Sequence, residues 1–190
     1  MNIYIGLALV YLLIINTFEN AYIFSIYFLI TMLLSTFVLS FIRKIVKPSL
    51  RIPVSIIITA IVITIIEIFI KKYIPSFYKD MGIYLPLIML ITYDFESNRN
   101  VGESIKFTFI RSIKYMGILL VIVLLKEFLA TNRITLMNNL SSITGYRAVY
   151  EILPKNNLVP ISIFSTSAGS FILVGFMLGI MNKLKGDRND

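Results

Sequence analysis

The amino-acid sequence predicts an all-α membrane protein with six transmembrane segments in a single integral membrane domain over residues 1–190. Three observations predict this fold class. Hydrophobic residues make up 57% of the chain, above the roughly 45–50% of a soluble domain, and the mean hydropathy is +0.85. Several uncharged stretches approach the roughly 20 residues that cross a bilayer. Lys and Arg gather in short stretches between them, as is typical of cytoplasmic loops.

Six uncharged or nearly uncharged stretches are the expected membrane segments. They cover residues 1–18, 21–42, 52–70, 81–93, 115–125 and 156–182. The first has no basic residue before it and no small-residue cleavage spacing, so we expect a retained segment and not a signal peptide. The third is interrupted only by Glu67.

The fourth and fifth stretches are too short to be simple spans. A run of about a dozen apolar residues is more typical of a buried, re-entrant or broken helix. Pro86 lies inside the fourth stretch and removes a backbone donor there. Broken helices at membrane depth often form a ligand or ion site. The alternative is an ordinary kinked helix with charged flanks.

A short internal repeat suggests how the six segments are arranged. Residues 3–7 read IYIGL and residues 83–87 read IYLPL, and each stretch opens a set of three segments. Because three spans reverse the direction of the chain, the two sets must be inverted. The prediction is two inverted three-helix halves, about 1–80 and about 81–190, with segments 1 and 4 short or broken and meeting near the middle of the membrane.

The basic residues predict the orientation in the membrane. Arg43, Lys44, Lys47 and Arg51 lie between segments two and three, and Lys183, Lys185 and Arg188 follow segment six. Six spans place both groups on the side of the N-terminus, which the positive-inside rule makes cytoplasmic. Lys71, Lys72 and Lys79 lie in an opposite loop, where the first two can snorkel from the helix end. The expected orientation is N-in and C-in.

The polar stretch at residues 131–155 lies outside the cytoplasm in this orientation. Its apolar residues, Leu136, Leu140, Ile143 and Val149, suit a short amphipathic helix on the membrane surface. An irregular loop is the alternative.

The residue types exclude several kinds of chemistry. The chain has no Cys and no His, so alone it builds no Cys nucleophile, zinc site with Cys or His ligands, thiolate-held iron–sulfur cluster or His-ligated haem. The net charge is +8. In a soluble protein this charge would suggest nucleic acid, but here cytoplasmic loops account for it. The expected surroundings are a lipid bilayer, with no nucleic-acid partner.

Several motifs carry a family resemblance. They are RIPV at residues 51–54, EIFIKKY at 67–73, MGIYLPLI at 81–88, KEFL at 126–129 and SAGSF at 167–171. Together they resemble the RnfE/NqrD and RnfA/NqrE membrane subunits of Rnf and Nqr ion-translocating electron-transport complexes. The RIPV stretch points to the RnfE/NqrD branch. The resemblance covers most of the chain and is weakest at residues 94–116.

The resemblance implies six helices in two inverted halves in a prokaryotic cytoplasmic membrane. It also implies pairing with an RnfA/NqrE-like membrane subunit, beside flavin-bearing membrane subunits. In the family, each of the two paired subunits supplies two cysteines to one [2Fe–2S] cluster. Leu9 and Thr92 occupy the corresponding positions here, and neither can give a thiolate. We therefore expect no cofactor bound by this chain alone, and we do not expect the [2Fe–2S] cluster of the family.

Two carboxylates are candidate ion-path residues. Glu67 lies near the end of segment three, where an intramembrane acid is costly and often functional, or it forms an interfacial pair with Lys71 at i,i+4. Asp94 follows the short fourth segment, where oxygen ligands suit a cation such as Na⁺. The alternative for Asp94 is the polar cap of a loop, partnered by Arg99.

Segment six carries a face of small residues. Gly169, Ser170, Gly175 and Gly179 are expected to form a partner interface, since small residues let helices approach closely. The serines of this segment either line a cavity or simply permit close packing. No catalytic residue is predicted, because a Ser nucleophile would lack a His base.

Three functions compete on these observations. The first is a scaffold subunit of an Rnf/Nqr-like electron-transfer complex that lacks its own cluster ligands. The second is a six-helix solute-binding subunit of an energy-coupling-factor type transporter, which size and charge suit equally well. The third is a repurposed paralogue that acts in assembly. The family-like motifs favour the first.

Overall fold

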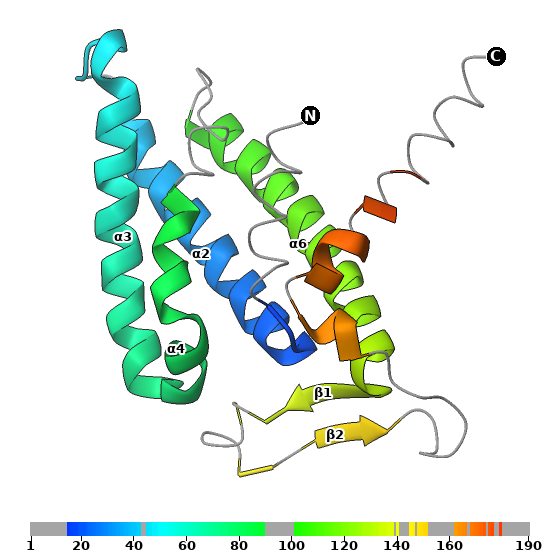
Figure 1. Ribbon diagram of the computed structural model, residues 1–190. Coiled ribbons are helices and arrows are strands. Elements are labelled where there is room, and N and C mark those ends of the chain that lie inside the picture. Colours follow the sequence, from blue (N-terminus) through cyan, green and yellow to red (C-terminus); the bar gives the residue numbers. More distant parts are fainter. Residues whose placement is uncertain are drawn as a thin grey trace, which may run out of the picture.

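The computed structural model describes residues 15–42, 45–89 and 101–138, together with residues 140, 145–146, 148–151, 162–166, 168–173, 175–176 and 179. Three described helices are long and apolar enough to cross a membrane (Figure 1). They are α2 (Phe18–Ile42), α3 (Arg51–Tyr73) and α6 (Val101–Thr131). The chain is therefore an integral membrane protein. Segment one falls largely outside the described residues, so the arrangement of six spans in two inverted halves stays a prediction.

Helices α2 and α6 pack against each other in opposite directions. The Phe28 and Tyr115 rings have centroids 4.7 Å apart, and the hydroxyls of Thr36 and Thr108 lie within hydrogen-bond distance at 3.1 Å. Residue numbers rise along α2 as they fall along α6, which makes the pair antiparallel (Figure 1). Phe24 and Phe28 form the centre of the core at this contact.

The fifth predicted segment is longer than its apolar run of residues 115–125. The structure shows one uninterrupted α-helix of 31 residues, so for this segment the buried or broken helix is wrong and the alternative, an ordinary helix with charged flanks, is the one observed. The sequence misled because Lys106, Arg111 and Lys114 divide the apolar pattern. Lys and Arg are good helix formers, so these charges do not end the helix.

The structure describes the predicted fourth segment, residues 81–93, as far as residue 89. Helix α4 (Pro75–Met81) leads into it, with the proline at the start of the helix where its missing N–H is not needed. The chain continues as the 3₁₀-helix η2 (Gly82–Ile88), which contains Pro86. The change of helix type agrees with the expectation of a short or broken segment. Another 3₁₀-helix, η1 (Pro48–Leu50), leads into α3.

The polar stretch after α6 forms a β-hairpin. Strands β1 (Arg133–Met137) and β2 (Ala148–Glu151) pair antiparallel, with a bulge between Thr135 and Met137. Both expectations for this stretch, a surface helix and an irregular loop, were therefore wrong. The missed signal is the enrichment of β-branched and aromatic residues in RITLM and AVYE. Asn132, with φ of 56°, makes the turn from the helix into β1.

Segment six is described in part. The 3₁₀-helix η3 (Ser162–Ser165) packs against α6, and residues 168–173, 175–176 and 179 are helical. The hairpin lies at the same end of the bundle as the start of α2 and the end of α6 (Figure 1). This end is where most of the buried charge collects.

Candidate functional site

Of the predicted site residues, the structure describes Glu67 and four residues of segment six. Leu9, Thr92 and Asp94 lie outside the described residues. The two carboxylates proposed for an ion path are therefore not brought together by what the structure shows. Glu67 has to be judged on its own surroundings.

Glu67 lies on α3 and is half-buried between the helices. Its Oε1 atom is buried and has no hydrogen-bond partner among the described residues. The hydroxyl of Tyr27, on the neighbouring helix α2, is buried and likewise lacks a partner. Lys71 forms no ion pair with Glu67. Its Nζ lies 5.6 Å from the centre of the Tyr78 ring instead.

A buried carboxylate oxygen without a donor is costly in a membrane protein. The i,i+4 pair with Lys71 would have explained Glu67 as an ordinary interfacial residue, and the described geometry does not contain that pair. A proton, a cation or a hydrogen-bond donor from outside the described residues would therefore stabilise the Glu67 carboxylate.

Of the four residues of segment six, two are buried and two are exposed. Gly169 is packed inside the chain, because an added Cβ would overlap the backbone of Ile163 and Phe164. Ser170 is also buried, and its hydroxyl lies 3.4 Å from the Thr166 carbonyl oxygen. Gly175 and Gly179 are exposed, with no described atom within 4 Å of an added Cβ. Only these last two are open to another chain.

The sequence interpretation missed a cluster of buried charges at the hairpin end of the bundle. We call Glu19, Lys126 and Glu127 the junction cluster. Their side chains are 1%, 1% and 3% exposed. Such burial of charge requires partners, and the structure supplies them from two separate parts of the chain, residues 15–18 and residues 135–140.

Lys126 holds the chain that leads into α2. Its Nζ donates to Oδ1 of Asn16 at 2.8 Å and to the backbone carbonyl oxygen of Ile15 at 3.2 Å. The neighbouring residue Glu127 binds a backbone donor of the same segment. Its Oε2 accepts a hydrogen bond from the backbone N–H of Phe18 at 2.7 Å. Two adjacent residues of α6 thus bind carbonyl and amide groups of residues 15–18.

The two carboxylates also attach the hairpin. Oε1 of Glu127 accepts from the backbone N–H of Thr135 at 3.0 Å and from the Thr135 hydroxyl. Glu19 accepts backbone N–H bonds from Asn138 and Leu140, each at 2.7 Å. The carboxylate oxygens are occupied by amide and hydroxyl donors. The junction cluster is therefore built to hold backbone and not to bind a metal.

Hydroxyl groups line the other half of the contact between α2 and α6. Ser104, Thr108 and Ser112 repeat every four residues along α6 and are all buried. Thr108 pairs with Thr36, whereas the Ser112 and Ser35 hydroxyls have no hydrogen-bond partner among the described residues. Such small hydroxyl side chains let two helix backbones approach closely in a membrane.

No metal site is found in the part of the chain that the structure describes. No group of three or more Asp and Glu side chains is close enough there to hold an ion, and the whole sequence has no Cys or His. The described residues offer single carboxylates, hydroxyls and amines.

The comparisons with known proteins give one match. A protein-family model described as "Rnf-Nqr subunit, membrane protein" matches residues 2–178. The matched range contains α2, α3, α6 and the junction cluster, and nearly the whole chain of 190 residues. No curated protein was found to match the sequence.

Proposed function

The chain belongs to the Rnf-Nqr family of membrane subunits, and on this premise we propose that it serves as a scaffold in an ion-translocating electron-transfer complex without supplying cluster ligands of its own. Its three long apolar helices suit a permanent place in the bilayer. The family resemblance implies that cysteines carry the electrons in such a subunit. This chain has no cysteine, so its proposed role rests on its helices and their packing surfaces.

The observation that carries the proposal is the complete absence of cysteine from the sequence. An iron–sulfur cluster needs thiolate ligands, with His as the usual substitute, and this chain has neither. The residues present therefore do not fit the [2Fe–2S] cluster that the resemblance implies. We derive no electron-transfer step through ligands of this chain.

What this chain retains supports a role in assembly of the complex. We propose that it pairs with an RnfA/NqrE-like subunit beside flavin-bearing membrane subunits, in a prokaryotic cytoplasmic membrane, with both termini inside. Gly175 and Gly179 support the pairing, because both are exposed and open to a close-packed partner helix.

Glu67 is our candidate for an ion path through this subunit, with Asp94 as a second member. The support is the buried, unpartnered Oε1 of Glu67 beside a second unpartnered group, the Tyr27 hydroxyl. A carboxylate in that position gains most from a proton or a cation. The scaffold role does not depend on Glu67, and loss of ion transport without loss of assembly would separate the two.

The composition of the native assembly tests the proposal. The tagged chain, expressed with its genomic neighbours, would be purified from membranes in mild detergent and its partners identified by mass spectrometry. We expect flavin-bearing subunits and a second family member in stoichiometric amounts. Purification with an ATPase pair would instead favour the transporter hypothesis, and a stable monomer would contradict both.

A further inference from the structure

The contact between α2 and α6 gives the depth of each side chain on α6. The uncharged stretch of α2, residues 21–42, is about 33 Å long at 1.5 Å per residue, which matches the roughly 30 Å hydrocarbon core of a bilayer. Tyr115 of α6 contacts Phe28, about a third of the way along this stretch. Lys114, the residue before Tyr115, therefore lies well inside the hydrocarbon core.

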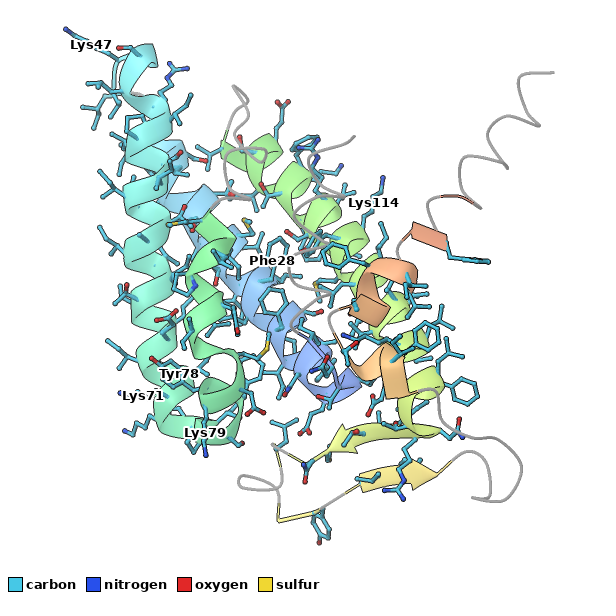
Figure 2. The ribbon with its side chains drawn as sticks, in the orientation of Figure 1. Phe28, Lys47, Lys71, Tyr78, Lys79 and Lys114 are labelled. Carbon is cyan, nitrogen blue, oxygen red and sulfur yellow. The ribbon has the colours of Figure 1, made fainter. Side chains whose placement is uncertain are left out.

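Lys114 is exposed at this depth. Its side chain projects from the side of α6 that faces away from α2 and α3 (Figure 2). No hydrogen bond or ion pair joins it to another residue that the structure describes. The neighbouring side chains Ile110, Ile113 and Ile118 are apolar and also exposed. An amine surrounded in this way by lipid would be costly.

Snorkelling does not relieve this cost. Phe28 lies seven residues inside the uncharged stretch of α2, so Lys114 is roughly 10 Å from the nearer membrane boundary. A lysine side chain of five single bonds reaches only about 6 Å. Lys106 is different, because it lies about 12 Å further along α6 toward its start. Thr108 meets Thr36, so Lys106 is level with about residue 38, roughly 6 Å from the end of α2 at Ile42. Lys106 can reach the membrane surface.

The six described carboxylates of this chain lie away from Lys114. Glu103 is eleven residues, about 16 Å, nearer the start of α6, Asp80 belongs to α4, and Glu151 belongs to strand β2. Glu67 belongs to α3, which packs on the far side of α2. Glu19 and Glu127 lie at the hairpin end and bind backbone N–H groups. Residues 1–14 contain no charged side chain. The counter-charge has to come from outside the described part of this chain.

The face around Lys114 suits a neighbouring helix. Gly117 follows one turn later on the same side of α6, is exposed, and has no described atom within 4 Å of an added Cβ. Ile113 and Val121 extend the face as exposed apolar residues. A small residue between apolar ones lets another helix approach closely, and close approach excludes lipid from the amine.

We propose that Lys114 forms an ion pair, inside the hydrocarbon core of the membrane, with an Asp or Glu side chain on a membrane-spanning helix of a partner subunit. The pair would set the depth and rotation of that helix against α6, because a buried charge is satisfied only in one register. The inference rests on the proposed place in a multi-subunit complex. It does not depend on the absence of a cluster.

Zero-length cross-linking tests the pair directly. Membranes that hold the full chain with its genomic neighbours would be treated with a membrane-permeant carbodiimide, which joins an amine to a carboxyl group in contact. We expect one cross-linked peptide between Lys114 and an acid within a membrane segment of another subunit. The cross-link should disappear in Lys114→Met and persist in the matched control Lys106→Met. Recovery of that subunit should fall several-fold in Lys114→Met and return in Lys114→Arg.

Three results would overturn the inference. The first is a complex with normal subunit recovery in Lys114→Met and no cross-link to Lys114, which would leave the proposed function intact. The second is a cross-link from Lys114 to an acid of the same chain. The third is the absence of any partner subunit, which would contradict the proposed function as well. Thermal unfolding of the isolated variants shows whether each of them folds.

Discussion

The backbone N–H of Phe18 donates a 2.7 Å hydrogen bond to Oε2 of Glu127, a residue 109 positions away in the sequence. The contact joins the first turn of α2 to the last turns of α6. The early N–H groups of a helix have no partner within it, and a carboxylate there is also favoured by the helix dipole. Glu127 therefore acts as the cap of a helix from the other predicted half.

Replacing Glu127 should weaken the attachment of both α2 and the hairpin. Glu127→Ala leaves the buried N–H groups of Phe18 and Thr135 without acceptors, and we expect a loss of about 2–4 kcal/mol in the free energy of unfolding. Thermal unfolding in detergent measures the loss. Glu103→Ala is the control, since Glu103 is exposed in the first turn of α6 and should change stability by about 0.5 kcal/mol or less. Equal effects of the two substitutions would contradict the assigned role.

The two kinds of glycine on segment six should respond differently to alanine. Gly169→Ala places a Cβ against the backbone of Ile163 and Phe164, so it should destabilise the isolated chain. Gly175→Ala meets no described atom and should leave the isolated chain unchanged while lowering the recovery of a partner subunit. Unfolding and co-purification measured on the same samples separate the effects. Normal partner recovery with Gly175→Ala would remove Gly175 from the interface.

The hydroxyl contact between α2 and α6 should contribute measurably to stability. Thr36→Val keeps the shape of the side chain and removes the hydroxyl that meets Thr108 at 3.1 Å, so we expect a loss of about 0.5–1.5 kcal/mol. Ser112→Ala is the matched control on the same face, because its hydroxyl has no partner among the described residues. It should be neutral or slightly stabilising. A larger loss for Ser112→Ala would mean that this hydroxyl is satisfied after all.

Helix α6 determines which loops lie on opposite sides of the membrane. At 31 residues it is about 46 Å long, longer than the bilayer core. Reporter fusions at Asn98 and Asn139 should therefore report opposite sides, with Asn98 on the cytoplasmic side if the basic loop is inside. Finding both positions on one side would exclude the expected orientation.

The sequence predicted the parts of the fold that follow from local pattern. Segments two and three emerged as uninterrupted helices close to their uncharged stretches, and the fourth is a 3₁₀-helix around Pro86, in agreement with a broken helix there. Segment five was underestimated, because charge-free length is a poor measure of a helix whose outer face carries Lys106 and Lys114. The hairpin was missed since its two strands are short, and their pairing depends on contacts with Glu19 and Glu127.

The junction cluster illustrates what a single sequence does not reveal. Lys126 and Glu127 were visible as part of a family-like motif, but their partners are mostly backbone groups of residues 15–18 and of the hairpin. Backbone groups carry no sequence signature. The sequence feature that could have indicated the cluster is the adjacent pair Lys126 and Glu127 at the end of an apolar run. Charged side chains that are buried at such a position need partners.

Iron binding tests the central claim of a family scaffold without a cluster most directly. The chain would be co-expressed with the RnfA/NqrE-like subunit proposed as its partner, purified, and analysed for iron and by absorption spectroscopy. The wild-type pair should contain no stoichiometric iron, because thiolate ligands are absent from this chain. The double variant Leu9→Cys with Thr92→Cys should bind iron with a partner that keeps both family cysteines. Stoichiometric iron in the wild-type pair, or in the wild-type chain purified on its own, would contradict the account.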